Sequence, residues 1–262
     1  MNFGICNLSI IPIRKDPNDA SEMVSQLLFG ELFSIIKKEK KWLHIQCEFD
    51  EYEGWIDIKQ AIEIERNIFE SYQNAEKGIS MEVVSAITNN SFHLPILIGS
   101  TLPYFDGMNF KLDKHKYIFN GQAIRHDNTN IDIEFIKKCA QKFLHAPYLW
   151  GGRSPFGIDC SGFVQIVFKL ANIKLKRDAY QQAEAGQTID LLEQTQIGDL
   201  AFFTNNDEER ITHVGIIIET EQSVKIIHAS GRVRIDILDH YGIYNKETKN
   251  YSHKLKLIKR LL

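Results

Sequence analysis

The feature that most constrains the fold is a change of hydrophobic pattern near residue 131. Before it, short apolar runs recur about every 10 residues between Gly, Pro and charged turns, which is typical of strands in small barrels. The clearest alternation spans Lys41–Cys47. After the change, apolar residues at helical spacing from Ile133 to Leu144 predict a helix that ends before Pro147.

A second apolar helix is predicted to begin near Asp159, and the rest of the chain is predicted to be mostly strand. The strands are expected at Leu200–Phe203, His213–Glu219, Ser223–Ala229, Val233–Leu238 and Leu255–Leu261. Helices followed by an antiparallel sheet make an α+β domain.

Three domains are predicted from these patterns. The first two are small β-barrels, and the last boundary falls at the polar stretch HDNTNID, residues 126–132. The domains are 1–62, 63–126 and 127–262.

Charge and hydropathy exclude several classes of partner. The formal net charge is −3, which argues against nucleic acid or an anionic membrane as the main partner. The sequence has no apolar run of about 18 residues that could span a membrane. The first residues, MNFGICNLSIIPIRKDPND, do not read as an export signal, so a cytoplasmic location is expected. An export signal that has been trimmed away stays an open alternative.

The four cysteines do not have the spacing of a metal or redox motif. Cys6, Cys47, Cys139 and Cys160 are scattered without CxxC pairs, and disulfides are not expected in a cytosolic protein. A zinc site of the Cys-His-His type is the remaining metal alternative, but no fourth ligand has suitable spacing. No metal and no cofactor are therefore expected.

Cys160 is the cysteine with a chemical context. It lies at the predicted first turn of a helix, where Asp159 is a good N-cap and free backbone amides favour an anion. A thiol attacks a carbonyl as its thiolate, so this position predicts a lowered thiol pKa. The same amides can hold the oxyanion of a tetrahedral intermediate. By contrast, Cys139 on IEFIKKCAQKF is expected to be a core residue.

Two histidines are candidates for the base. His213 opens the run HVGIII, and His228 lies in IIHAS. If Glu221 and Gln222 form the turn between the two strands, Thr220 faces Ser223 and His228 faces Gly215. Both histidines then lie on the same side of the sheet, so His213 can take the proton of Cys160 while His228 orients its ring. The remaining histidines are expected to be surface residues or satisfied partners.

These residues resemble a known family. The motifs PYLWGGRSPFGIDCSGFVQ, GDLAFF, THVGIII and IIHAS occur in this order over about residues 131–262 and resemble the NlpC/P60 cysteine peptidases. The resemblance implies a papain-like fold in which Cys160 is the nucleophile, His213 the base and His228 the third member. The stretch PIRKDPNDASEMVSQLLFGELFSIIKKEKKWLHIQCEFDEYEGWID resembles a bacterial SH3 domain.

The combination of SH3-like domains followed by an NlpC/P60 domain resembles the γ-D-glutamyl-L-diamino acid endopeptidases. This resemblance implies a murein peptide substrate with a free N-terminal L-Ala, cut after its γ-linked D-Glu. Tyr148, Asp159 and Ser161 are the implied substrate contacts, and Glu53 of the SH3-like part is a further candidate. Asp159 can pair with the substrate ammonium or act only as a helix cap, and Tyr148 can be a buried aromatic instead.

One position departs from the family pattern. Members often have Ser or Thr where RDAYQQ has Ala179, so one substrate hydrogen bond is expected to be missing.

Three functions remain open at this point. The first is a cytoplasmic peptidase that trims murein peptides during recycling, with diaminopimelate or lysine as the third substrate residue. The second is a hydrolase of intact cell wall, anchored by its SH3-like domains. The third is a non-catalytic binding protein.

Overall fold

The computed structural model describes residues 2–89, 91–125, 132–204 and 209–262. The chain divides into two units: Met1–Asn130 with Trp150–Pro155, and Ile131–Leu149 with Phe156–Leu262. The predicted turn at 126–132 and the predicted boundary after residue 126 fall on residues outside the described ones, except for Asp132.

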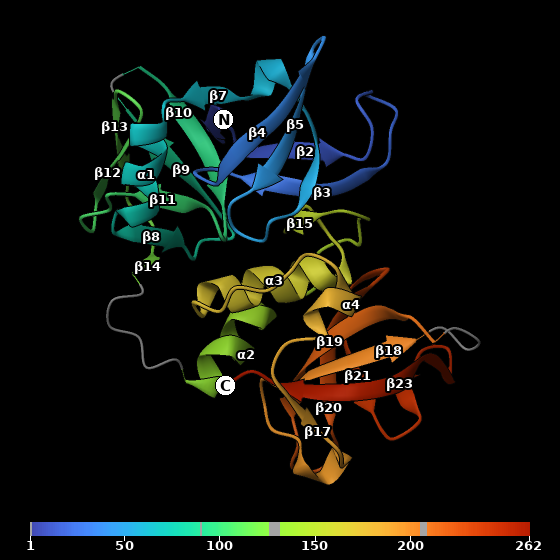
Figure 1. Cartoon of the computed structure of the whole chain (residues 1–262). Helices are drawn as coiled ribbons and strands as arrows, with labels where there is room; N and C mark the ends of the chain where they lie inside the picture. The colour runs from blue at the N-terminus through green and yellow to red at the C-terminus, as the bar shows by residue number, and fades with distance from the viewer. Residues whose placement is uncertain (1, 90, 126–131, 205–208) are drawn as a thin grey trace. The chain divides into compact units, whose positions relative to one another are not determined.

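The first unit begins with a seven-stranded sheet in the order β3-β2-β6-β5-β4-β1-β7 (Figure 1). Its strands are β1 (Asn2–Ile5), β2 (Ile10–Arg14), β3 (Met23–Leu28), β4 (Leu32–Glu39), β5 (Trp42–Cys47), β6 (Glu53–Asp57) and β7 (Ile62–Ile64). The alternation expected at Lys41–Cys47 is β5, whose Leu43, Ile45 and Cys47 are buried in one core. Strand β7 pairs with β1, so this sheet continues past the expected boundary at residue 62.

The rest of the first unit contains one helix and two smaller sheets. Their strand orders are β10-β9-β13-β12 and β11-β8-β14. The elements are α1 (Arg66–Asn74), β8 (Lys77–Ser80), β9 (Val84–Thr88), β10 (His93–Leu97), β11 (Thr101–Pro103), β12 (Asn109–Leu112), β13 (His115–Phe119) and β14 (Ala123–Arg125). Phe3 of β1 and Phe29, which follows β3, share a core with Ile87, Phe110 and Phe119. This core thus contains residues from both of the first two predicted domains. The division between these two domains stays a prediction.

A short segment from the middle of the chain completes the first unit. It contains β15 (Arg153–Ser154). Gly151 has φ of 74°, and a Cβ there would lie 2.3 Å from the carbonyl oxygen of Met23, so only glycine fits. Two nitrogens of Arg153 donate to the carboxylate of Glu31 at 2.8 and 3.0 Å. Both side chains are less than 5% exposed, so this is a buried ion pair.

The second unit consists of short helices and one large sheet in the order β17-β23-β18-β19-β20-β21-β22 (Figure 1). Because β22 also pairs with β23, strands β18 to β23 close into a barrel. The elements are α2 (Ile133–Gln141), β16 (Gly157–Ile158), α3 (Cys160–Leu170), α4 (Ala179–Gln182), β17 (Gln187–Ile189), β18 (Leu200–Thr204), β19 (Ile211–Glu219), β20 (Lys225–Ser230), β21 (Arg232–Leu238), β22 (Gly242–Asn245) and β23 (Asn250–Arg260).

Helix α3 is the central helix of this unit. Asp159 caps it by accepting a hydrogen bond from the backbone of Gly162, as the sequence predicted. It ends at Leu170 with Ala171 as its C-cap, and Asn172 follows with φ of 57°, a left-handed conformation that stops a helix. All residues of α3 are buried, and it packs against β19 and β20.

The strands expected in this unit are confirmed, with one correction at a turn. Gly215 faces His228, which is the predicted register. The register shifts further along, so Glu219 faces Lys225 and the expected pair of Thr220 with Ser223 does not form. An α+β description therefore holds only loosely, because strands dominate this unit and the closing strand β22 was not expected.

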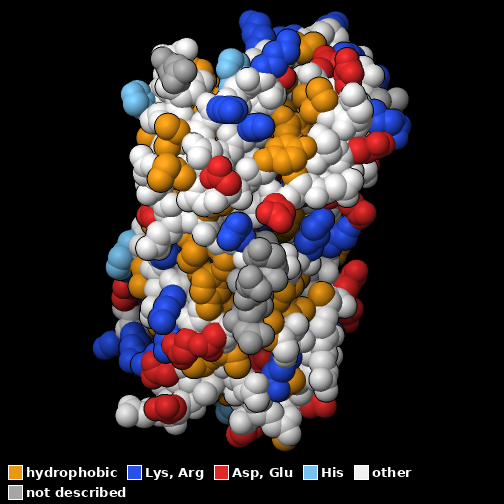
Figure 2. All heavy atoms as spheres, turned by 90° about the vertical axis from the view of Figure 1, so that its left-hand side faces the viewer, with side chains coloured by type: hydrophobic (Ala, Val, Ile, Leu, Met, Phe, Trp, Pro, Cys, Tyr) orange, Lys and Arg blue, Asp and Glu red, His pale blue; other side chains and the backbone are white. Residues whose placement is uncertain are grey.

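Two further observations concern hydropathy and surface charge. No helix among the described residues is long and apolar enough to cross a membrane. On the face shown in Figure 2, basic and acidic side chains are mixed rather than gathered in a patch of one sign.

We expect Arg153→Met to lower the free energy of unfolding by about 3 kcal/mol, because it leaves the carboxylate of Glu31 buried without its cation. Lys37→Met is the matched control, because Lys37 pairs with Glu39 at the exposed surface. Urea unfolding followed by fluorescence measures both. Equal midpoints for the two variants would contradict the buried pair's contribution.

Candidate active site

Cys160 lies at the start of α3, next to the strand that carries His213. Its thiol is 4.0 Å from the carbonyl oxygen of Thr212, and it accepts a hydrogen bond from the backbone of Val214. The sulfur therefore lies against the backbone on both sides of His213. This places the predicted nucleophile beside the strand of the predicted base.

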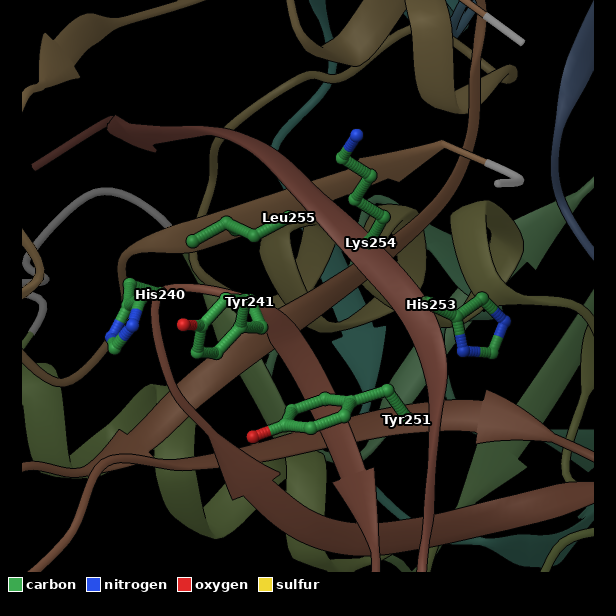
Figure 3. Close-up of a pocket in the computed structure, with 6 residues that line it drawn as sticks. All are labelled: His240, Tyr241, Tyr251, His253, Lys254 and Leu255. Atoms are coloured by element: carbon green, nitrogen blue, oxygen red, sulfur yellow. The ribbon is translucent and has the colours of Figure 1, made fainter. Parts of the chain in front are cut away.

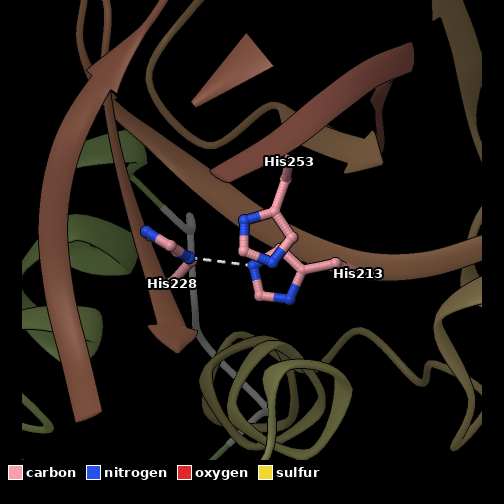
Figure 4. A group of neighbouring side chains, drawn as sticks. All are labelled: His213, His228 and His253. Atoms are coloured by element: carbon pink, nitrogen blue, oxygen red, sulfur yellow. Dashed lines mark hydrogen bonds between the residues drawn. The ribbon is translucent and has the colours of Figure 1, made fainter. Parts of the chain in front are cut away.

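The two predicted histidines are in direct contact. His213 Nε2 lies 2.8 Å from His228 Nδ1, as the dashed line in Figure 4 shows. The other nitrogen of His228, Nε2, lies 3.1 Å from Oδ2 of Asp236. Arg234 donates to both carboxylate oxygens of Asp236, at 2.6 and 3.0 Å. These groups form one hydrogen-bonded chain across β19, β20 and β21.

The protonation states along this chain follow from burial and partners. Burial lowers the pKa of His213 well below its ordinary value, with contributions from His253 and His228. Burial also lowers the pKa of His228, against the opposing effect of its bond to Asp236. Burial raises the pKa of Asp236, but hydrogen bonds from His228 and Arg234 outweigh it and leave that pKa lowered. Both imidazoles are thus neutral, and the carboxylate is ionised.

A third histidine, for which no role in the site was predicted, belongs to this cluster. The ring of His253 stacks on that of His213, with centroids 4.0 Å apart and planes inclined by 20°. Burial lowers the pKa of His253 to about 4. His253 is also one wall of a pocket of about 370 Å³ (Figure 3). The other lining residues are His240, Tyr241, Tyr251, Lys254 and Leu255.

Sequence reasoning missed Asp236 and His253 for different reasons. Asp236 of β21 faces Ile226 of β20, which lies two residues from His228 and on the same side of the sheet. The counting that paired His228 with Gly215 could therefore have been extended to Asp236. His253 lies on β23, whose pairing with β18 contains a register shift. No local pattern in the sequence indicates that shift.

The three imidazoles are close enough to be considered as metal ligands. One nitrogen from each of His213, His228 and His253 lies within 4.8 Å of the others. The rings of His213 and His253 lie 4.0 Å apart in nearly parallel planes, and an imidazole lone pair lies in the plane of its ring, so these lone pairs do not meet at one ion. A zinc ion needs nitrogens aimed at it from about 2.1 Å. Nε2 of His213 is also already bonded to His228. The described arrangement of His213, His228 and Asp236 is that of a hydrogen-bonded chain.

The expected lowering of the Cys160 thiol pKa is wrong for the resting protein. Burial and the charge of Asp159 raise that pKa to about 12, although backbone N–H groups of Val214 and Ser161 and the charge of Arg177 oppose the rise. Loss of hydration around the sulfur outweighs the helix terminus. The resting site therefore holds a neutral thiol beside a neutral imidazole.

The predicted substrate contacts Asp159 and Ser161 are bound to a residue that sequence reasoning missed. Arg177 donates to both oxygens of Asp159, at 3.0 and 2.6 Å, and to Oγ of Ser161 at 2.9 Å. The carboxylate of Asp159 is thus both a helix cap and half of a buried ion pair. Its expected pairing with a substrate ammonium stays a prediction.

The other predicted contacts lie in different parts of the chain. Tyr148 is partly buried, and its pKa is raised by burial and by the charges of Cys160 and Asp159, so it lies near the sulfur. Ala179 is buried at the start of α4. Glu53 belongs to the first unit, where it is exposed and accepts a hydrogen bond from Gln46. Its part in the site stays a prediction.

Two family models match this chain. The model of the NlpC/P60 family matches residues 145–253, and that of the bacterial dipeptidyl-peptidase Sh3 domain matches residues 13–60. The first match contains Cys160, His213, His228 and Asp236.

Two curated relatives and one solved structure are similar to the chain. A gamma-D-glutamyl-L-lysine dipeptidyl-peptidase of Bacillus subtilis is 27% identical over 219 residues, covering 74% of this chain and 69% of that protein. A protein of the same name from Bacillus cereus is 26% identical over 245 residues, covering 80% and 71%. The crystal structure of an NlpC/P60 family protein from Bacillus cereus has a TM-score of 0.83 at 19% identity and covers 99% of both chains.

We expect His253→Phe to flatten the acid side of the stability profile. The unfolded chain protonates this imidazole below pH 6.5, but the folded chain does so only near pH 4. The unfolded state therefore binds more protons in this window, and the free energy of unfolding falls as the pH decreases through it. Phenylalanine removes this contribution, which is at most about 1.4 kcal/mol per pH unit.

Urea titrations between pH 7 and pH 4 measure the slope for both proteins. A second set of titrations between pH 7 and pH 8 is the internal control, because His253 is neutral there in both states and the two proteins should show the same slope. Parallel curves throughout would mean that His253 is protonated equally in the folded and unfolded chain.

Proposed function

Because this chain belongs to the NlpC/P60 family, we propose that it is a cysteine peptidase that cleaves murein-derived peptides after a γ-linked D-glutamate. The observation that carries the proposal is the position of the Cys160 sulfur against the backbone on both sides of His213, whose ring continues to His228. The proposed nucleophile, base and orienting group then follow one another in space.

The proposed reaction starts from the neutral pair. As Cys160 attacks the carbonyl carbon, His213 takes the thiol proton, so charge separation occurs only when the electrophile is in place. Backbone N–H groups in the first turn of α3 stabilise the oxyanion. The protonated His213 then donates to the leaving amine, and water hydrolyses the thioester with His213 again acting as base.

The substrate class rests on the relatives. Both curated relatives carry gamma-D-glutamyl-L-lysine in their names, and the SH3 model that matches residues 13–60 is one described for bacterial dipeptidyl-peptidases. We therefore assign a short peptide with a free N-terminal L-Ala, cut between D-Glu and the diamino acid. A role in murein recycling in the cytoplasm is part of the proposal, and cell fractionation tests the location.

Substrate size separates this proposal from its main alternative. A recycling enzyme releases L-Ala-γ-D-Glu from free tri- and tetrapeptides and leaves polymeric murein intact. An anchored wall hydrolase solubilises polymeric murein. Mass spectrometry of the products from both substrates, with lysine and with diaminopimelate peptides, distinguishes them.

We expect Cys160→Ser and His213→Ala to abolish turnover, because each removes a group that takes part in bond making. His228→Ala should lower kcat by about 100-fold, since it removes the orientation of the base and not the base itself. Release of L-Ala-γ-D-Glu measured by mass spectrometry gives the rates.

Cys139→Ala is the matched thiol control, because Cys139 is buried in α2 and should be dispensable for turnover. Circular dichroism confirms that each variant is folded. Full activity of Cys160→Ser, or loss of activity in Cys139→Ala with an intact fold, would refute the assignment of the nucleophile.

A further inference from the structure

We propose that Asp236, fixed by Arg234, is a positioning residue that sets the tautomers of both histidines and so makes Nδ1 of His213 the catalytic base. This inference rests on the proposed peptidase function and extends it by one residue beyond the Cys-His-His set. The proposal follows from which atoms can donate and which can accept along the buried chain.

The carboxylate of Asp236 is built into the interior of the second unit. Asp236 is 6% exposed and His228 only 1%. Oδ2 of Asp236 faces Nε2 of His228 at 3.1 Å and accepts from Nε of Arg234 at 2.6 Å. Arg234 also reaches Asn245 and Glu247, which hold its guanidinium in place. The acceptor is therefore fixed in position on one side of His228.

The first step fixes the tautomer of His228. An ionised carboxylate can only accept hydrogen bonds. Nε2 of His228 must therefore carry the hydrogen in its contact with Asp236. Because a neutral imidazole has one N–H, Nδ1 of His228 is left with a lone pair.

The second step fixes the tautomer of His213. Nδ1 of His228, now an acceptor, faces Nε2 of His213 at 2.8 Å. Nε2 of His213 must carry its single hydrogen, which leaves a lone pair on Nδ1. The opposite assignment along the chain would place a hydrogen on Nδ1 of His213, and that nitrogen could not accept a proton from Cys160.

The groups around Asp236 leave its carboxylate to determine the tautomer of His228. Without it, His228 still faces Arg234 across the two strands, and this guanidinium can only donate. A guanidinium there favours a lone pair on Nε2 of His228 and reverses both tautomers. If Asp236 acted only through its charge, its removal would change the pKa of His228 but would not move the hydrogen from one ring nitrogen to the other.

Three substitutions at and beside this position, with a fourth at the surface as control, separate the effect of the acceptor from those of side-chain shape and charge. Asp236→Leu keeps a similar volume but has no acceptor, and it should lower kcat by about 100-fold with little change in KM. Asp236→Asn can keep an oxygen toward His228 and Nε of Arg234, and it should retain at least about a tenth of kcat. Arg234→Gln keeps the carboxylate of Asp236 and should also retain at least about a tenth of kcat. Glu219→Gln, in the partly exposed pair with Lys225 at the end of β19, lies outside this network and should leave the rate unchanged.

Nitrogen-15 NMR of labelled histidine reads the tautomers without any substrate. In the wild type, Nε2 of both His213 and His228 should give the shift of a protonated nitrogen, and in Asp236→Leu the protonated nitrogen should be Nδ1. Arg234→Gln should keep the wild-type pattern, and it provides the test if Asp236→Leu does not fold.

The outcomes distinguish this inference from the proposed function. Unchanged tautomers in folded Asp236→Leu, or a rate within about threefold of wild type, would overturn the role of Asp236 while leaving the peptidase assignment in place. Reversed tautomers in Arg234→Gln would overturn it as well. A wild type that cleaves no γ-glutamyl peptide but shows the expected tautomers would refute the substrate assignment and retain the hydrogen-bonded chain.

Discussion

The site depends on a buried hydrogen-bonded chain inside an otherwise apolar barrel. His213, His228 and Asp236 occupy the same strand faces as Ile217, Ile226 and Leu238, which belong to the apolar core of the second unit. A polar group at such a depth is costly unless it is satisfied. The chain is satisfied only when each imidazole adopts one tautomer, so burial is the constraint from which the proposed direction of proton transfer follows.

Burial also changes how the nucleophile can work. The start of a helix favours an anion, but Cys160 lies where loss of hydration dominates and raises its pKa. A neutral thiol is chemically quiet, and it becomes reactive when a base withdraws its proton during attack. A low pKa for His213 and a high pKa for Cys160 are thus two results of one dry environment.

Asp159 shows how one side chain can satisfy several needs at once. It caps α3 through the backbone of Gly162, and it holds Arg177, which also binds Ser161. This network fixes the first turn of the helix that presents Cys160. An implied substrate contact is therefore first of all part of the support of the nucleophile.

The sequence by itself determined the elements and their local chemistry. The sequence predicted the strands that carry His213 and His228, counting placed His228 opposite Gly215, and Asp159 marked the start of α3. These features depend on residues close in the chain, where spacing and capping rules apply. Tertiary structure alone decided the contacts of His253 and Arg177, the closure of the barrel and the pKa of Cys160. Such features depend on burial and on strand registers with irregular shifts, and neither is encoded in local spacing.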